Sequence, residues 1–258
     1  MQPVLLPIYG PIAIHAYGLC IAVGGLITFG LLSNDKQARS VISKSVLTNL
    51  FQLIILAAYL GGRIVTMITE QSIMRDPLFL FKFWEPGFSI LGSVIGVTVA
   101  LASYFYNKQI SLLLFLDRGA IYIPILQSFG RVGCFFAGCC YGMPSTSWYA
   151  VTYTDSAHMA PLHCSLHPAQ LYSAATLFII FLFLYFIQQY RVKNRGELFC
   201  SYIALIATER FLIDFVRWDR VFIVSPSFLQ LFSVHQWIAL AMCFGAMLGV
   251  LVIRKLQQ

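Results

Sequence analysis

Seven charged residues lie inside stretches of this sequence that are otherwise apolar, and they are the first candidates for chemistry. The basic ones are Arg63, Arg118, Arg131 and Arg210, and the acidic ones are Asp117, Glu209 and Asp214. At membrane depth a charged side chain costs about 2.5–3.5 kcal/mol on insertion scales. Such residues are retained when they pair with one another or act on a ligand, so each is a functional candidate.

Arg131 and Arg210 are the best candidates for binding an anion, because one neighbouring acid cannot satisfy two guanidinium groups. The planar fork of arginine matches phosphate, and in a membrane the available phosphate is a phospholipid head group. The alternative is a structural ion-pair network, since Arg210 and Asp214 are four residues apart on one helix face. For Asp117 and Arg118, near a predicted cytoplasmic end, we favour the structural role.

The seven cysteines are scattered and odd in number. Those in apolar segments, Cys20, Cys200 and Cys243, are expected to be small buried hydrophobic residues. The outer group comprises Cys139, Cys140 and Cys164, with His158, His163 and His167 nearby in sequence. That group allows a disulfide or a metal site, but its spacing matches no zinc motif, so we expect no metal and no cofactor. Only the Cys139–Cys140 pair supports a further alternative, an enzyme that uses its own thiol as nucleophile.

Small residues offer a packing interpretation of the same region. They recur at every fourth position as Gly130, Cys134, Gly138 and Gly142, and again as Gly92, Gly96 and Ala100. This spacing predicts helix faces that are nearly bare, where helices approach closely or leave a groove for an acyl chain.

The elements that carry these residues must be membrane helices. Of the 258 residues, 59% are hydrophobic and 10% are charged, with a mean hydropathy of +0.78, so a soluble core cannot hide the apolar surface. Residues 1–34 contain no Lys or Arg, which argues against a cleaved signal peptide. Seven segments are long enough to cross a bilayer. Because backbone amides have no water to bond in lipid, they must pair within the segment, so each segment is expected to be a helix. They are residues 12–32, 46–69, 88–106, 112–136, 170–189, 198–216 and 234–253.

The predicted fold is therefore an all-α integral membrane protein: one transmembrane domain, residues 1–258, with about seven helices. Basic residues are unevenly spread, nine in one alternate set of loops and tail and four in the other. By the positive-inside rule the N-terminus lies outside and the C-terminus in the cytoplasm. The net charge of +7 then reflects topology rather than nucleic-acid binding. Residues 141–169, between the fourth and fifth helices, form a long outer loop expected to contain a short strand or a lid.

Six blocks in order resemble the bacterial prolipoprotein diacylglyceryl transferases. They are GPIAIHAYGL (10–19), LGGRI (60–64), DPLFLFKFWEPGFS (76–89), GR-x-G-x(8)-G (130–142), HPAQLY (167–172) and RFLIDFVR (210–217). The resemblance implies a transferase of the bacterial inner membrane, without a cofactor. It would move the diacylglyceryl group of phosphatidylglycerol to the lipobox cysteine of prolipoprotein signal peptides as a thioether and release glycerol phosphate.

The resemblance also implies roles for individual residues. Arg131 corresponds to the phospholipid-binding arginine, and Gln170 and Gly142 fall in substrate-binding motifs. The catalytic candidates are Arg210, Asp214, which takes the place of a glutamate, Tyr17 of the first-helix motif, and His167.

Departures from the family pattern concern the acceptor thiol. Leu91 stands where the family has a histidine proposed as the thiol's base, and Cys134 and Cys139 replace an asparagine and a glutamate beside the arginine. Since a thiolate is the nucleophile, Asp214, His167 or, less favoured, His15 must substitute if a base is needed. The alternatives are a divergent member that uses another acceptor, or a relative that binds or moves phospholipid without catalysis.

Overall fold

The computed structural model describes residues 4–9, 12–70, 77–82, 84–85, 87–108, 111–192, 194–222 and 230–256. Arg75 and Lys193, which contribute to the charge distribution above, lie outside the described residues. The chain forms two compact units. The first comprises residues 1–6, 14–32 and 116–258, and the second comprises residues 7–13 and 33–115.

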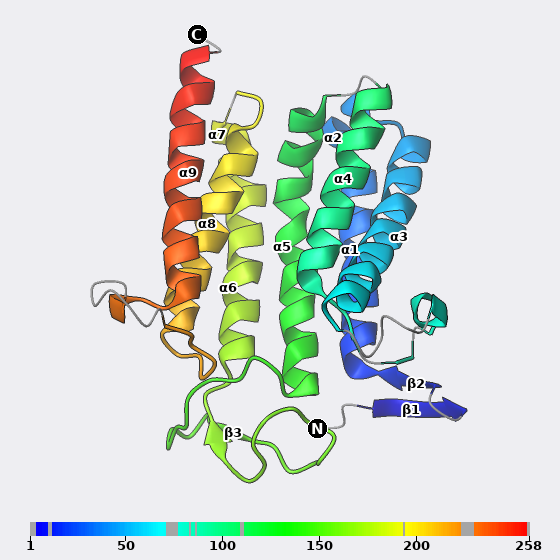
Figure 1. Ribbon diagram of the computed structural model, residues 1–258. Coiled ribbons are helices and arrows are strands. Elements are labelled where there is room, and N and C mark those ends of the chain that lie inside the picture. The colour runs from blue at the N-terminus through cyan, green and yellow to red at the C-terminus, as the bar shows by residue number, and fades with distance from the viewer. Residues whose placement is uncertain are drawn as a thin grey trace. The chain divides into compact units, whose positions relative to one another are not determined.

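Each of the seven predicted segments is a helix. They are α1 (Ala16–Asn34), α3 (Lys44–Thr69), α4 (Ile90–Lys108), α5 (Leu112–Ala137), α6 (Ala169–Phe183), α8 (Glu197–Asp214) and α9 (Val234–Leu256). Six are long and apolar enough to cross a membrane, α6 being continued to Arg191 by a π-helical turn (Leu184–Gln188) and α7 (Gln189–Arg191). The seventh, α8, carries four charged residues within its 18. The all-α membrane fold is thus confirmed (Figure 1).

Shorter elements complete the described chain. They are α2 (Lys36–Val41), the 3-10 turn η1 (Pro77–Leu80), β1 (Val4–Tyr9), β2 (Ile12–His15), β3 (Val151–Thr152) and β4 (Ser165–Leu166). Residues 12–15, predicted as the start of the first helix, are therefore a strand. In the outer loop β3 pairs antiparallel with β4, Val151 opposite Leu166, which confirms the short strand expected there.

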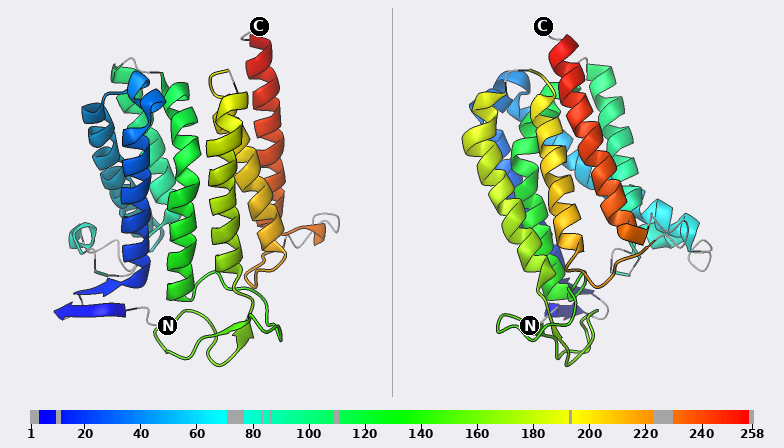
Figure 2. Two further views of the ribbon diagram at one scale, coloured as in Figure 1. Left: turned by 180° about the vertical axis from the view of Figure 1, so that it is seen from behind. Right: turned by 90° about the vertical axis from the view of Figure 1, so that its left-hand side faces the viewer.

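In the first unit, α6, α8 and α9 pack side by side, and α5 lies against α6 (Figures 1 and 2). Buried Ile121 of α5, Leu177 of α6 and Tyr202 of α8 belong to the core between these helices. At one end of the bundle, the side chain of Asp117 accepts the backbone amides of Gly196 and Phe199, at 2.5 and 2.8 Å. Asp117 thus caps α8, whose own cap residue is a glycine, so its expected structural role is confirmed.

The second unit is built on a close crossing of α3 and α4. A Cβ placed on Gly92 would clash with the carbonyl oxygen of Gly61, and one on Gly96 would lie 2.5 Å from the carbonyl of Ala57. The predicted approach along Gly92 and Gly96 is confirmed. Arg63 is buried in this unit and donates to the carbonyls of Lys82, Glu85 and Gly87, at 2.7–3.0 Å, so it has a structural explanation.

The end of α5 differs from the small-residue prediction. The helix ends at Ala137, and Gly138 adopts φ +72°. Its amide bonds to Phe135 O at 3.3 Å, and the amide of Cys139 bonds to Cys134 O at 3.2 Å. These two bonds are a Schellman cap, which requires a left-handed residue and so favours glycine. Gly138 and Gly142 therefore lie beyond the helix, and the turn folds Cys139 back towards α5.

Candidate functional site

Three arginines gather where α5 and α8 end. Arg131 lies in the last turns of α5, Arg210 in the last turns of α8, and Arg217 just after α8. Arg131 and Arg217 are each close enough to Arg210 to repel it electrostatically. Among the described residues, the side chain of Arg131 makes no hydrogen bond or ion pair, and that of Arg210 has a single ion pair of 3.6 Å, to Asp214. Converging guanidinium groups with unused donors are suited to bind an anion.

Glu209 supplies a buried negative charge beside these arginines. It is 5% exposed, accepts a short hydrogen bond from the hydroxyl of Ser173 on α6, and interacts electrostatically with all three arginines. With Arg220 included, four guanidinium groups face the three carboxylates of Glu209, Asp214 and Asp219, which leaves the cluster with one positive charge. The electrostatics therefore favour the binding of a further anion.

Asp214, at the end of α8, is the centre of a second polar cluster. It is 1% exposed and accepts a short hydrogen bond from the hydroxyl of Ser233. Its oxygens also lie 3.6 Å from Arg210, 3.7 Å from Arg220 and 3.9 Å from His235. The predicted Arg210–Asp214 pair is present, but Asp214 shares its charge among several partners. Asp214 therefore joins the start of α9 and the segment after α8 to Arg210.

The sequence Ser233-Val-His-Gln236 explains how α9 presents Ser233. The backbone amide of Ser233 donates to the side-chain oxygen of Gln236 at 3.0 Å, and the amide of Gln236 donates to the hydroxyl oxygen of Ser233 at 3.1 Å. This reciprocal arrangement is a capping box. Arg220 also donates to Gln236, at 3.0 Å, so the whole helix start is bound into the cluster.

Tyr17, at the start of α1, belongs to the same site. It interacts electrostatically with Arg131 and with the three thiols of Cys134, Cys139 and Cys140. A Cβ on Gly133 would lie 3.0 Å from the Tyr17 ring and 3.2 Å from its carbonyl oxygen. The glycine therefore permits the close approach of α1 to α5 that brings Tyr17 beside Arg131.

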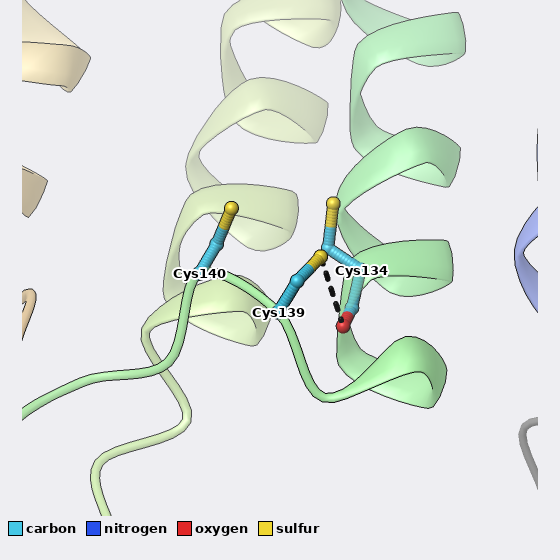
Figure 3. Close-up of side chains that lie close together, drawn as sticks. All are labelled: Cys134, Cys139 and Cys140. Carbon is cyan, nitrogen blue, oxygen red and sulfur yellow. Dashed lines mark hydrogen bonds between the residues drawn. The ribbon is translucent and has the colours of Figure 1, made fainter. Parts of the chain in front are cut away.

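The three thiols of Cys134, Cys139 and Cys140 converge (Figure 3). Their sulfur atoms all lie within 4.8 Å of one another, although the residues come from a helix and from the turn after it. Cys140 has a left-handed backbone (φ +59°), which is uncommon for a residue with a side chain. Hydrogen bonds with the other two thiols, together with the guanidinium of Arg217, lower the pKa of Cys140.

Arg217 is fixed by the loop that follows α5. The amide of Met143 donates to Val216 O at 2.8 Å, and that of Trp218 to Tyr141 O at 3.2 Å. The guanidinium of Arg217 donates to Asp219 at 2.7 Å, and this hydrogen bond lowers the pKa of the Asp219 carboxyl. These contacts hold Arg217 near both Cys140 and Arg210.

Of the remaining predicted site residues, Gly142 and His167 lie in the outer loop and Gln170 lies in the first turn of α6. Gln170, 1% exposed, donates to Cys139 O at 2.8 Å and so holds the cysteine turn, while its side-chain oxygen is buried without a partner. Gly142 packs against His167, where a Cβ would lie 2.6 Å from the histidine's Cβ. The His167 ring is 3.1 Å from the Tyr172 hydroxyl and lines an open cavity of about 520 Å³ with Pro144, Ser145, Thr146 and Ser165.

The predicted residues thus divide into two groups. Tyr17, Arg131, Arg210 and Asp214 are brought together by direct or electrostatic contacts. His167 joins the loop cavity, and the described residues show no contact between its ring and these arginines. Sequence reasoning missed Arg217, Arg220, Ser233 and His235 as members of the site; the S-x-x-Q capping box was the only available signal for the last two.

Comparison with known proteins identifies relatives over almost the whole chain. The family model for prolipoprotein diacylglyceryl transferase matches residues 3–252. A phosphatidylglycerol–prolipoprotein diacylglyceryl transferase of Clostridium tetani is 32% identical over 238 residues, which cover 91% of this chain and 94% of the relative. One from Dehalococcoides mccartyi is 36% identical over 257 residues, with 95% and 92% covered. A second enzyme of that name from Clostridium perfringens is 30% identical over 249 residues, with 96% and 94% covered.

Proposed function

The chain belongs to the prolipoprotein diacylglyceryl transferase family, and on that premise we propose that its arginine cluster binds the phosphate of phosphatidylglycerol. The observation that carries the proposal is the state of Arg131, a guanidinium at the end of a membrane helix without a hydrogen bond or ion pair to the described residues. Arg210, with one long ion pair, supplies further donors. A phosphodiester satisfies both groups.

The transfer breaks the bond between the glyceryl carbon and the phosphate oxygen. As a thiolate attacks that carbon, a carbon–sulfur bond forms and the electron pair of the carbon–oxygen bond moves to the phosphate. The phosphate thereby changes from a monoanionic diester to a dianionic monoester, which leaves as glycerol phosphate. Because charge grows on the phosphate as the bond breaks, Arg131 and Arg210 bind the transition state more strongly than the substrate.

The acceptor is the thiol of a lipobox cysteine in a prolipoprotein signal peptide. Tyr17 and Asp214 act at the donor site, Tyr17 beside Arg131 and Asp214 through its contact with Arg210. Gln170, Gly142 and His167 shape the outer entrance, since Gln170 holds the cysteine turn and Gly142 packs against His167. Transfer to another acceptor is the second candidate function, favoured by Leu91 in place of the family's histidine.

The decisive experiment follows thioether formation on a lipobox peptide in phosphatidylglycerol vesicles. Arg131→Ala and Arg210→Ala should each reduce turnover by about 10²–10³-fold, the usual effect of losing one transition-state donor. Arg254→Ala is the matched control, because Arg254 pairs with Glu197 at the start of α8. Normal turnover in both site variants would exclude the phosphate-binding role.

A genetic experiment separates the two acceptors. The chain should sustain growth of a bacterium depleted of its own prolipoprotein diacylglyceryl transferase, because this protein and the depleted enzyme would act on the same prolipoproteins. Failure to complement, with good expression and with turnover of phosphatidylglycerol retained in vitro, would favour a different acceptor.

The membrane setting is part of the proposal. The chain is a multi-pass membrane protein, and we place it in the bacterial cytoplasmic membrane with its N-terminus outside. The uneven distribution of Lys and Arg supports this orientation. This orientation puts the arginine cluster in the outer leaflet. Labelling of cysteines introduced at each terminus, with a reagent added from one side of the membrane at a time, would test the orientation.

A further inference from the structure

We propose that Cys134, Cys139 and Cys140 bind one Zn²⁺ ion, and that the acceptor thiol occupies the fourth position on the metal. This inference rests on the proposed function, since it concerns how the acceptor of that reaction is activated. The pattern of the sequence indicates no zinc motif, and it is the fold that brings the three cysteines together.

The three sulfur atoms are spaced almost as they would be around one metal ion. The three sulfur atoms lie within 4.8 Å of one another, and the described residues add no fourth His, Cys, Asp or Glu to this group. Sulfur atoms around one tetrahedral zinc, with Zn–S bonds of about 2.3 Å, lie roughly 3.8 Å apart. Side-chain rotation of the cysteines is enough to close that difference. Structural zinc sites use four protein ligands, whereas three ligands and an open position are typical of catalytic sites.

The three cysteines are held rigidly by the fold. Figure 3 shows Cys134 on α5 and the other two on the turn that follows, with Cys139 Sγ directed at Cys134 O, 3.8 Å away. The Schellman cap at Gly138 fixes this turn, and Gln170 holds the carbonyl of Cys139 at 2.8 Å. A preorganised group of ligands loses little conformational freedom when it binds a metal.

Arginines near the thiols affect the charge balance of the proposed metal site. Three thiolates around Zn²⁺ carry one net negative charge, which a membrane interior disfavours unless cations lie nearby. Arg131 interacts with Cys134, and Arg217 interacts with Cys140. Arg131 and Arg217 therefore offset part of this negative charge, while Arg217 also pairs with Asp219.

A zinc ion would activate the acceptor thiol by removing its proton. The acceptor must attack as a thiolate, and Leu91 cannot accept its proton. A thiol that coordinates zinc is deprotonated outright, and its proton leaves to water. The zinc-bound thiolate then forms the carbon–sulfur bond while the phosphate takes the electron pair of the broken carbon–oxygen bond. No oxidant or reductant is required. Cys134 lies one turn after Arg131 on α5, so the metal would lie beside the bound phosphate.

The first test is the zinc content of the purified full chain, prepared under reducing conditions. We expect one zinc per chain in the wild type and none in the Cys139→Ser, Cys140→Ser double variant. Cys243→Ser, on α9 outside the group, is the matched control and should keep its metal. A reduced wild-type protein that binds no zinc, or one that contains a disulfide among these cysteines, would overturn the proposal.

The second test reports on the open position without measuring activity. In the Co²⁺-substituted wild type, a lipobox peptide that contains cysteine should change the visible spectrum, and the same peptide with serine should not. An identical spectrum with and without the cysteine peptide would show that the acceptor does not reach the metal and would overturn the proposal.

Turnover separates this proposal from the proposed function. Removal of zinc by a chelator should abolish thioether formation, and added Zn²⁺ should restore it; the chelated wild type gives this answer even if the double variant fails to fold. Arg210→Ala, whose charged partners do not include the three thiols, should lose turnover but keep both zinc and the cobalt response. Full activity in the chelated enzyme would refute the zinc site and leave the phosphate-binding proposal intact. A wild type that binds zinc but transfers nothing would refute both, since the inference concerns the acceptor of that reaction.

Discussion

Nδ1 of His235 faces Oδ1 of Asp214 at 3.9 Å, and both atoms are buried without a hydrogen-bond partner. The rest of the imidazole is accessible, since the side chain is 40% exposed. In many enzymes a histidine next to a buried carboxylate acts as a general base, the two groups being hydrogen-bonded, and in this protein a shortening of the 3.9 Å distance would be needed to form that bond. His235 is therefore the alternative to zinc as the group that activates the acceptor thiol.

The His235→Gln variant distinguishes these mechanisms. If zinc activates the thiol, we expect turnover to fall by less than about tenfold, whereas loss of a general base typically lowers the rate by about 10²–10⁴-fold. The measurement is the pH profile of thioether formation in both proteins. A loss in that larger range would identify His235 as the base.

Arg217 should be as important as the two arginines identified from the sequence. Its guanidinium is buried, contacts Cys140 and is held by Asp219. We expect Arg217→Ala to reduce turnover by about 10²-fold, because a cation near the developing phosphate charge is lost. Arg217→Lys should recover part of the activity but not the forked contact. An Arg217→Ala enzyme as active as the Arg254→Ala control would show that Arg217 only joins the two loops.

The sequence predicts those parts of this protein that depend on local pattern. Apolar length identifies six of the seven helices, and the seventh, α8, lies in a predicted segment although it carries four charged residues within its 18. Intramembrane cost selects Arg131 and Arg210 as candidates, which the structure places near each other, and small-residue spacing identifies the contact of Gly92 and Gly96 with α3.

The remainder depends on where separate segments meet. Arg217 looks like an ordinary loop arginine until the segment after α5 pairs with it, and His235 lies 21 residues from Asp214 in sequence. The cysteine group was missed for a related reason. A regular helix through Gly142 would have spread the three cysteines along it, but the helix ends at Ala137 and the Schellman turn brings them together.

Asp117 should contribute stability but not catalysis. It caps the start of α8 at the end opposite the arginine cluster, with backbone bonds of 2.5 and 2.8 Å. We expect Asp117→Ala to lower the free energy of unfolding by about 1–2 kcal/mol, as for other lost N-caps. Asp117→Asn, which keeps one acceptor oxygen, should lose less. Thermal unfolding in detergent micelles measures this effect, and an alanine variant as stable as the wild type would show that the cap is dispensable.

Two glycine substitutions should change stability in opposite directions. In Gly92→Ala, the new methyl group would meet the backbone of Gly61 and lie 2.7 Å from Cβ of Val65, so α3 and α4 must separate. Such overpacking typically costs about 1–3 kcal/mol. In Gly245→Ala, on α9, the methyl group has no neighbour within 4 Å, and the better helix propensity of alanine should add up to about 1 kcal/mol. The same unfolding assay compares both variants with the wild type. If Gly92→Ala were as stable as Gly245→Ala, the glycines of α3 and α4 would not be needed for close packing, and their spacing would require another explanation.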